Sequence, residues 1–217
     1  MHQDDVARGY DAAAEGYAEE LFEELERKPL DRHLLNRFAE SVAGRGPVLD
    51  LGCGPGHVTK YLRARGVDAE GVDLSQEMIR VARTRTPSAP FRAGDMRRLT
   101  DADGSIAGIV AFYSIVHLAP EELSPFFNEL RRLLAEDGLA LVAFHVGEEV
   151  VHVDELFGAK VNLDFQFHAP SAVIDAMAAA GLPTIERVER EPYEGAEHPS
   201  RRCYLLGRRV RHSEPVR

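Results

Sequence analysis

The sequence predicts an α/β fold in which a mostly parallel sheet of seven strands carries helices on both faces. Short apolar runs alternate along the chain with segments whose apolar residues recur at helical spacing. A glycine-rich turn joins the first apolar run, 48–51, directly to a helix. The last two strand patterns, 184–190 and 202–208, have no helix between them. They are therefore expected to pair antiparallel and to close the sheet.

The remaining elements are expected in a regular order. A helix over 4–26 should end at Pro29, and a second helix should run from Asp31, its expected N-cap, to Val42. The pattern breaks down between 146 and 169, where an irregular segment is expected to serve as a substrate loop. Strands are expected at 48–51, 68–73, 89–93, 106–112, 139–145, 184–190 and 202–208, with helices after the glycine turn and at 76–84, 121–134 and 171–180.

Composition excludes several function classes. With 217 residues, the chain has room for one α/β domain with a sizeable core. The formal net charge of −10 argues against a nucleic-acid partner, because nucleic-acid binders usually show a basic footprint. The sequence has no signal-peptide segment or membrane-spanning run, so we expect no membrane partner and a cytoplasmic location. Cys53 and Cys203 lack metal-ligand spacing, so no metal site is expected.

The glycine turn after the first strand is the strongest functional signal. Gly52, Gly54 and Gly56 permit positive φ and leave no Cβ to keep a ligand from the backbone. A helix N-terminus follows at once, so a small polar ligand is expected there. In a dinucleotide fingerprint the last glycine would stand at His57, and Asp50 would repel a pyrophosphate but suit an ammonium group. An NAD(P)-dependent oxidoreductase is therefore disfavoured.

The run Asp50-Leu51-Gly52-Cys53-Gly54-Pro55-Gly56 closely resembles motif I of the class I S-adenosylmethionine (SAM)-dependent methyltransferases. The resemblance covers nearly the whole chain. It implies a single domain over 1–217, with lid helices in 1–43 and a Rossmann-like core over 46–210. It also implies SAM as cofactor and S-adenosylhomocysteine (SAH) as product. The cofactor contacts implied by motif I are Asp50, Gly52, Cys53, Gly54 and Gly56.

Two further acids follow neighbouring strands. Asp73 lies 21 positions after Gly52 at a strand end, where a carboxylate can accept both ribose hydroxyls of an adenosine; the alternative is a helix-dipole partner. Asp95 falls in a stretch resembling the family's next motif, which implies that it binds the adenine amino group, or it is an ordinary turn residue. The neighbouring cofactor contacts expected are Leu74, Met78 and Met96.

Tyr10 and Tyr17 lie seven positions apart and so share one face of the first helix. In methyltransferases that this chain resembles, such helices form a lid over SAM and the acceptor. The resemblance therefore implies that Tyr10 and Tyr17 contact SAM and that Tyr17 also contacts the acceptor. Both are equally well explained as core aromatics of a docked helix.

Residues 113–120 resemble the family's motif IV, whose backbone faces the methionine part of SAM and whose side chains face the acceptor. Tyr113 is therefore expected against SAM and is an alternative polar contact to the acceptor. Methyl transfer depends mainly on alignment, and a general base adds about 10²–10⁴-fold. His117, after the fourth strand, is the first candidate base and His145, after the fifth, is the second. For each histidine a structural role competes, and His57 is expected to be structural.

The favoured function is methyl transfer from SAM to an O or N atom of a small molecule by a monomer or homodimer. A methyltransferase acting on RNA or protein and a non-catalytic SAM-binding protein remain alternatives. Phe165 and His168 belong to the expected substrate loop, and Arg201 either binds an acceptor carboxylate or lies on an exposed edge strand. The acceptor contacts expected are Tyr17, His117, His145, Phe165, His168 and Arg201.

Overall fold

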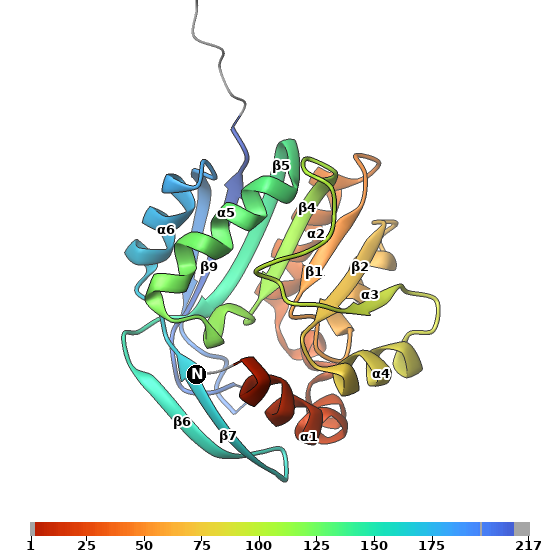
Figure 1. The fold of residues 1–217 in the computed structure, drawn as a ribbon, viewed down its shortest axis with the longest axis vertical. Coiled ribbons are helices and arrows are strands. Elements are labelled where there is room, and N and C mark those ends of the chain that lie inside the picture. The colour runs from red at the N-terminus through yellow and green to blue at the C-terminus, as the bar shows by residue number, and fades with distance from the viewer. Residues whose placement is uncertain (1–2, 196, 211–217) are drawn as a thin grey trace, which may run out of the picture.

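The computed structural model describes residues 3–195 and 197–210 and contains a seven-stranded sheet of order β3-β2-β1-β4-β5-β9-β8 (Figure 1). The strands pair in parallel except for β9, which is antiparallel to both β5 and β8. This confirms the expected mostly parallel sheet with its last strand reversed. The strands are β1 (Val48–Leu51), β2 (Ala69–Asp73), β3 (Phe91–Ala93), β4 (Ile106–Phe112), β5 (Leu134–His145), β8 (Thr184–Arg190) and β9 (Arg202–Arg208).

Helices cover both faces of this sheet. Apolar residues of α5 and α6 pack with β4 and β5 in one core cluster, and those of α2 and α3 pack in another. Because both faces are covered, the central strands are apolar on both sides: all of β1 is buried. The helices are α1 (Gln3–Leu21), α2 (Pro29–Val42), α3 (His57–Arg63), α4 (Gln76–Arg85), α5 (Leu123–Leu133) and α6 (Pro170–Ala179), with 3-10 turns η1 (Glu24–Arg27), η2 (Ile115–His117) and η3 (Pro120–Glu122).

The expected boundary between the first two helices is wrong. Pro29 occupies the first turn of α2 rather than ending α1, a position where the missing N–H of proline removes no helical hydrogen bond. Asp31 consequently lies inside α2, where its side chain is fully buried instead of capping the helix. The first helix already ends at Leu21, and η1 bridges the two.

The expected irregular segment between 146 and 169 is also wrong, because it forms a two-stranded hairpin. Strand β6 (Val150–Leu156) pairs antiparallel with β7 (Ala159–Gln166). Phe157 and Gly158 form the turn with φ of 48° and 81°, and such left-handed pairs match the twist of a two-residue hairpin loop. The hairpin projects from the carboxyl end of β5 and lies along α1 (Figure 1). Its mixed polar pattern reflects strands that are covered on only one side.

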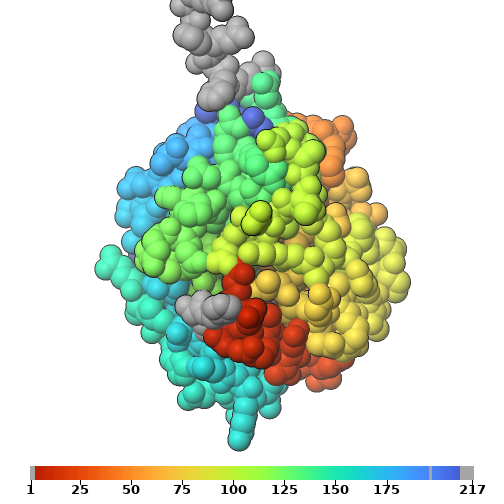
Figure 2. Space-filling model, in the orientation of Figure 1, coloured from red at the N-terminus to blue at the C-terminus, as the bar shows by residue number. Residues whose placement is uncertain are grey.

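Two glycines of α1 allow this contact. A Cβ at Gly9 would lie 2.8 Å from the Leu163 Cδ2 atom of β7, and one at Gly16 would overlap the carbonyl oxygen of Phe157. Glycine destabilises a helix interior, and here it lets the hairpin backbone come close to α1. In the space-filling view, α1 fills the gap between the hairpin and the region of α4 (Figure 2). None of the helices within the described residues is long and apolar enough to cross a membrane.

Candidate active site

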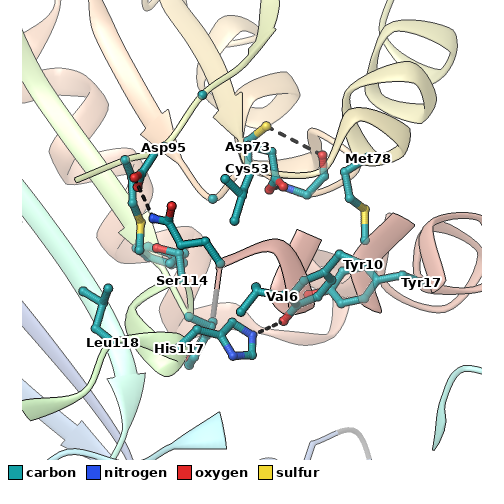
Figure 3. Close-up of a pocket in the computed structure, with 18 of the residues that line it drawn as sticks. Val6, Tyr10, Tyr17, Cys53, Asp73, Met78, Asp95, Ser114, His117 and Leu118 are labelled. Atoms are coloured by element: carbon teal, nitrogen blue, oxygen red, sulfur yellow. Dashed lines mark hydrogen bonds between the residues drawn. The ribbon is translucent and has the colours of Figure 1, made fainter. Parts of the chain in front are cut away.

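A cavity lies at the carboxyl ends of β1, β2 and β4, beneath α1 (Figure 3). With its mouth it contains about 1020 Å³ of empty space. Its wall is built from α1, η1, the glycine turn, and the segments that follow β2, β3 and β4.

The glycine turn contributes Gly52, Cys53 and Gly54 to the wall. Gly52 has a φ of 69°, and a Cβ there would overlap the side chain of Ser114, so only glycine fits this approach of two strand ends. Gly56 does not line the cavity. It lies at the N-cap of α3 with a φ of 86°, where a Cβ would stand 2.6 Å from the ring of Phe91. Its role is therefore to let the turn pack on the sheet.

Asp50 does not line the cavity either. Its buried carboxylate accepts a hydrogen bond of 2.7 Å from the Thr59 hydroxyl on α3, and burial raises its pKa to about 6. The expectation that Asp50 faces a ligand ammonium is therefore not supported by its position. The side chain points under the glycine turn because α3 folds back over β1 and presents Thr59 to it.

Asp73 ends β2 and faces the cavity. One carboxylate oxygen accepts a hydrogen bond of 2.8 Å from the Gly54 N–H, and the other accepts one of 2.9 Å from the Ser75 N–H. Burial raises its pKa. Asp73 thus ties the glycine turn to the start of α4 and still has lone pairs for a ligand. Leu74 and Met78 line the cavity beside it.

Asp95 and Met96 line the cavity. The Asp95 carboxylate accepts a hydrogen bond of 2.6 Å from the side-chain amide of Gln3, in the first turn of α1 (Figure 3). The other oxygen accepts a hydrogen bond of 3.2 Å from Arg97 Nε. A residue of α1 that the sequence did not single out therefore occupies the carboxylate expected to bind adenine.

Tyr10 and Tyr17 both face the cavity from α1, with their ring centroids 5.9 Å apart (Figure 3). Burial raises the pKa of both phenols. The Tyr17 ring packs edge-on against Phe157 at the hairpin tip, at 5.3 Å between centroids. The Tyr10 hydroxyl lies 2.8 Å from His117 Nε2. The two tyrosines thus line the cavity and also connect α1 to the hairpin, Tyr17 through Phe157 and Tyr10 through His117.

His117 is fixed on both sides of its ring. Its Nδ1 lies 2.9 Å from the carbonyl oxygen of Asp164 in β7, which can only accept, so Nδ1 carries the hydrogen. Nε2 therefore has the free lone pair and accepts from the Tyr10 hydroxyl. Burial lowers the pKa of His117 to about 4, so the ring is neutral near pH 7. Phe165 packs behind it at 4.9 Å between centroids and stays outside the cavity.

Three other expected acceptor contacts lie elsewhere. His145 stacks on Phe167 and bonds Ser200 at 2.7 Å. His168 Nε2 donates to the Ile115 carbonyl oxygen at 3.1 Å, and Arg201 pairs with Glu189 at 2.7 Å. None of them lines the cavity. The 198–200 segment and η2 provide closer partners for the histidines, and Arg201 is exposed just before β9.

Tyr113 lines the cavity directly after β4 and has a φ of 53°, a conformation that costs energy for a residue with a side chain. Buried partners hold it there. Its hydroxyl lies 2.7 Å from that of Tyr204 and 3.3 Å from the Asp31 carboxylate, which also binds Arg190 at 3.0 Å. Burial raises the pKa of the Tyr113 phenol. The ring is therefore a fixed wall with its polar end turned away into a hydrogen-bond network.

Sequence reasoning missed one acid of the cavity wall, Glu24. Glu24, in η1, accepts from Lys28 Nζ at 2.6 Å and from His57 Nε2 at 3.1 Å. Burial alone would raise its pKa, but His57 and Lys28 lower it to about 2, so the carboxylate is ionised. Glu24 is one of nine acids in the first thirty residues, and no spacing distinguished it from the others. His57, expected to be structural, also lines the wall.

The cavity has unmet hydrogen-bonding capacity that suits SAM. Within the described residues, His57 Nδ1 and Ser114 Oγ are buried without a partner, and both residues line the cavity. Three carboxylates, from Glu24, Asp73 and Asp95, also face it. SAM offers ribose hydroxyls, an amino group, an ammonium and a sulfonium, which are donors and positive charges. The residues present therefore fit this cofactor.

Comparison with known proteins points the same way. Residues 48–138 match the family model of a methyltransferase domain. The matched region is similar to class I SAM-dependent methyltransferases, and this similarity favours SAM as the ligand of the cavity. The match begins at β1 and so includes the glycine turn, Asp73 and Asp95.

Two relatives found by sequence and one solved structure are also named as methyltransferases. The chain is 32% identical to demethylmenaquinone methyltransferase of Beutenbergia cavernae over 64% of its length and 55% of the relative's. It is 40% identical to trans-aconitate 2-methyltransferase of Rhizobium meliloti over 36% of its length and 30% of the relative's. The alignments thus span about half or less of these relatives. The geranyl diphosphate C-methyltransferase of Streptomyces coelicolor, solved with SAH, has the same fold, with a TM-score of 0.71, 16% identity and coverage of 96% and 98%.

Proposed function

We propose that this protein transfers a methyl group from SAM to an oxygen atom of a small molecule held beneath α1. The observation that carries the proposal is one cavity beneath α1 with two chemically different parts of its wall. One end has the glycine turn and the carboxylates of Asp73 and Asp95. The other has the Tyr10–His117 hydrogen bond. We also infer one domain over the whole chain, with a lid in 1–43 and a core in 46–210.

The cofactor end would hold SAM through residues of this chain. Asp73 would accept the ribose hydroxyls, and Asp95 with Met96 would meet the adenine, against Met78. The glycine turn and Glu24 would face the methionine end, where the ionised carboxylate suits an ammonium group. SAM, when bound, supplies an electrophilic methyl group on a sulfonium. The protein's part is to orient the reactants and exclude water, which is worth roughly 7–11 kcal/mol in favourable cases.

The acceptor end consists of Tyr10 and His117 with a mainly apolar surround, Val6, Phe112 and Leu118. This end is covered by α1, so the acceptor must be small enough to be enclosed. A macromolecular acceptor such as RNA or a protein is disfavoured by that enclosure and by the net charge of −10. The relatives' names give different acceptors, including demethylmenaquinone and trans-aconitate, so they do not select one for this chain.

An oxygen acceptor is favoured over an amine by the base strength of His117. An imidazole with a pKa of about 4 does not take a proton from an alkylammonium, whose pKa is about 10. It does take one from a hydroxyl oxygen, which becomes strongly acidic as its bond to the methyl group forms. His117 is therefore suited to remove the proton of an O-acceptor late in the reaction.

The first test is calorimetric titration of the purified chain with SAM, SAH and NADH, followed by an assay for SAH release with small hydroxyl compounds. We expect SAM and SAH to bind and NADH not to bind. NADH binding alone would contradict the assignment of the glycine turn. SAM binding without SAH release from any acceptor would instead favour a non-catalytic SAM-binding protein.

A further inference from the structure

We propose that the acceptor is an uncharged molecule whose reacting hydroxyl donates a hydrogen bond to the Tyr10 oxygen, and that carboxylate and phosphate compounds are rejected. The inference rests on the proposed function and specifies its substrate class. Two independent observations support it. One is the distribution of charge around the cavity, and the other is the direction of the hydrogen bond between Tyr10 and His117.

The charge on the cavity wall is negative. Glu24, Asp73 and Asp95 line it, whereas its one arginine among the described residues is Arg97. The Arg97 guanidinium is already bound by the carboxylates of Asp95 and Glu122. An anionic acceptor at the Tyr10–His117 end would therefore lose its hydration without gaining a free arginine or lysine from the described residues of the wall. An uncharged acceptor has no such cost.

Nearby cations outside the wall do not change this conclusion. Lys28 Nζ and the Arg202 guanidinium lie 5.1 and 5.9 Å from the centroid of the Tyr113 ring. Neither of them lines the cavity, whereas the Tyr113 ring does. Lys28 is bound by Glu24 at 2.6 Å and by Glu197 at 3.4 Å. Arg202 donates to the carbonyl and hydroxyl oxygens of Ser200. These cations are thus engaged by their own partners.

The Tyr10–His117 pair presents an acceptor to the cavity rather than a donor. The Asp164 carbonyl fixes the hydrogen on His117 Nδ1, so Nε2 receives the hydrogen of the Tyr10 hydroxyl. What Tyr10 offers to a ligand is its oxygen lone pairs. A hydroxyl can donate to them, but a carboxylate or phosphate oxygen that carries no hydrogen would face another lone pair. The geometry therefore selects a protic group.

The same arrangement accounts for the proton released during transfer. The hydroxyl oxygen of the acceptor forms a bond to the methyl carbon, and the electron pair of the broken carbon–sulfur bond stays on sulfur. The acceptor's proton passes to the Tyr10 oxygen while the Tyr10 proton passes to His117 Nε2, which becomes an imidazolium. A carboxylate acceptor would release no proton, so this relay would have no role in its methylation.

Matched pairs of compounds test the substrate class. Each pair joins a hydroxy acid to its methyl ester, such as 4-hydroxybenzoate and methyl 4-hydroxybenzoate, and is incubated with the full chain and methyl-labelled SAM. For the pairs that are labelled, we expect the ester to react at least tenfold faster, at its hydroxyl. Equal or faster labelling of the acids would overturn the inference and leave the proposed function intact. No label in any compound would contradict the proposed function, and the inference with it.

The relay is tested separately from the substrate class. Tyr10→Phe keeps the ring and removes the oxygen, so turnover should fall at least tenfold while the SAH dissociation constant stays within about twofold. The matched control is Tyr61→Phe, because the Tyr61 hydroxyl bonds Asn36 away from the cavity. Nitrogen-15 NMR should give the Nδ1–H tautomer for His117, assigned by its loss in His117→Asn. Unchanged turnover in Tyr10→Phe, or the Nε2–H tautomer, would overturn the relay.

Discussion

The two ends of the cavity are built in different ways. The cofactor end comes from consecutive strand ends of one parallel sheet, with Gly52, Asp73 and Asp95 each set by the strand before it. The acceptor end comes from segments far apart in the sequence: Tyr10 meets His117 across 107 positions, and His117 meets Asp164 across 47. The first end depends on local spacing, whereas the second depends on how α1 and the hairpin dock.

The largest expected effect concerns the cofactor end. Asp73→Ala removes the carboxylate that binds Gly54, Ser75 and, by our assignment, the ribose. The SAM dissociation constant should rise about 100-fold, since hydrogen bonds to charged groups are worth about 1.5–3 kcal/mol each. Calorimetry measures this, with Asp68→Ala as control because Asp68 is an exposed partner of Arg63. An unchanged constant would refute the ribose assignment.

The next largest effect concerns the packing of the hairpin on α1. The sign of the stability change in Gly16→Ala tests this packing. Glycine to alanine in a helix normally stabilises by about 0.5–1 kcal/mol. Gly16→Ala should instead destabilise by about 1–3 kcal/mol, because its Cβ would overlap the Phe157 carbonyl. Urea unfolding measures the change. The control, Ala12→Gly on the exposed side of α1, gives the helix propensity term alone. Stabilisation by Gly16→Ala would show that the hairpin does not press on α1.

Buried histidines and the buried Glu24 carboxylate should lower the stability in two different pH ranges. Burial lowers the pKa of His117 to about 4 and that of His145 to about 3. The unfolded chain, with histidine pKa values of about 6.5, binds these protons first, so stability is full above that pH and falls as pH drops toward 4. Asp50, with a pKa raised to about 6, opposes this, because its contribution is lost as pH rises from about 4 to 6.

A second loss of stability should follow below about pH 4.5, where Glu24 is protonated in the unfolded chain but stays ionised, with a pKa of about 2, in the folded one. Unfolding free energies from urea titrations between pH 7.5 and 4 check the first phase, which should cost about 3 kcal/mol for each histidine. His145→Asn should reduce its slope. A slope unaffected by that substitution would mean that His145 is not held neutral.

The smallest effect concerns the contact between Gln3 of α1 and Asp95, which follows β3. Their 2.6 Å hydrogen bond occupies a carboxylate that we assign to adenine. Gln3→Ala should therefore tighten SAM binding about threefold, the modest net value of a hydrogen bond exchanged between partners. Calorimetry measures this against Gln76→Ala, an exposed residue on α4. Weaker binding in Gln3→Ala would mean that the amide supports the cofactor instead.

Predictions from the sequence are right where local spacing places a residue and wrong where the docking of distant segments does. Spacing predicts Asp73 at the cavity, and the family resemblance implies Asp95, Gly52 and Gly54 there; all of them line it, because parallel strands bring their carboxyl ends to one edge. The same reasoning is right for only one of three histidines. His117 faces the cavity, whereas His145 and His168 bond to partners outside it. Which way a side chain after a strand points depends on neighbours that the strand itself does not specify.

Local patterns in the chain predict the sheet and its reversed last strand, because apolar periodicity acts over a few residues at a time, and the run Asp50–Gly56 carries the family resemblance that implies the cofactor. Only the tertiary structure decided the β6–β7 hairpin, the inward position of Glu24 and the Tyr10–His117 pair. Each of these depends on the docking of α1 between the hairpin and the core. Docking is a sum of many weak contacts between distant segments, and no local pattern in the chain records it.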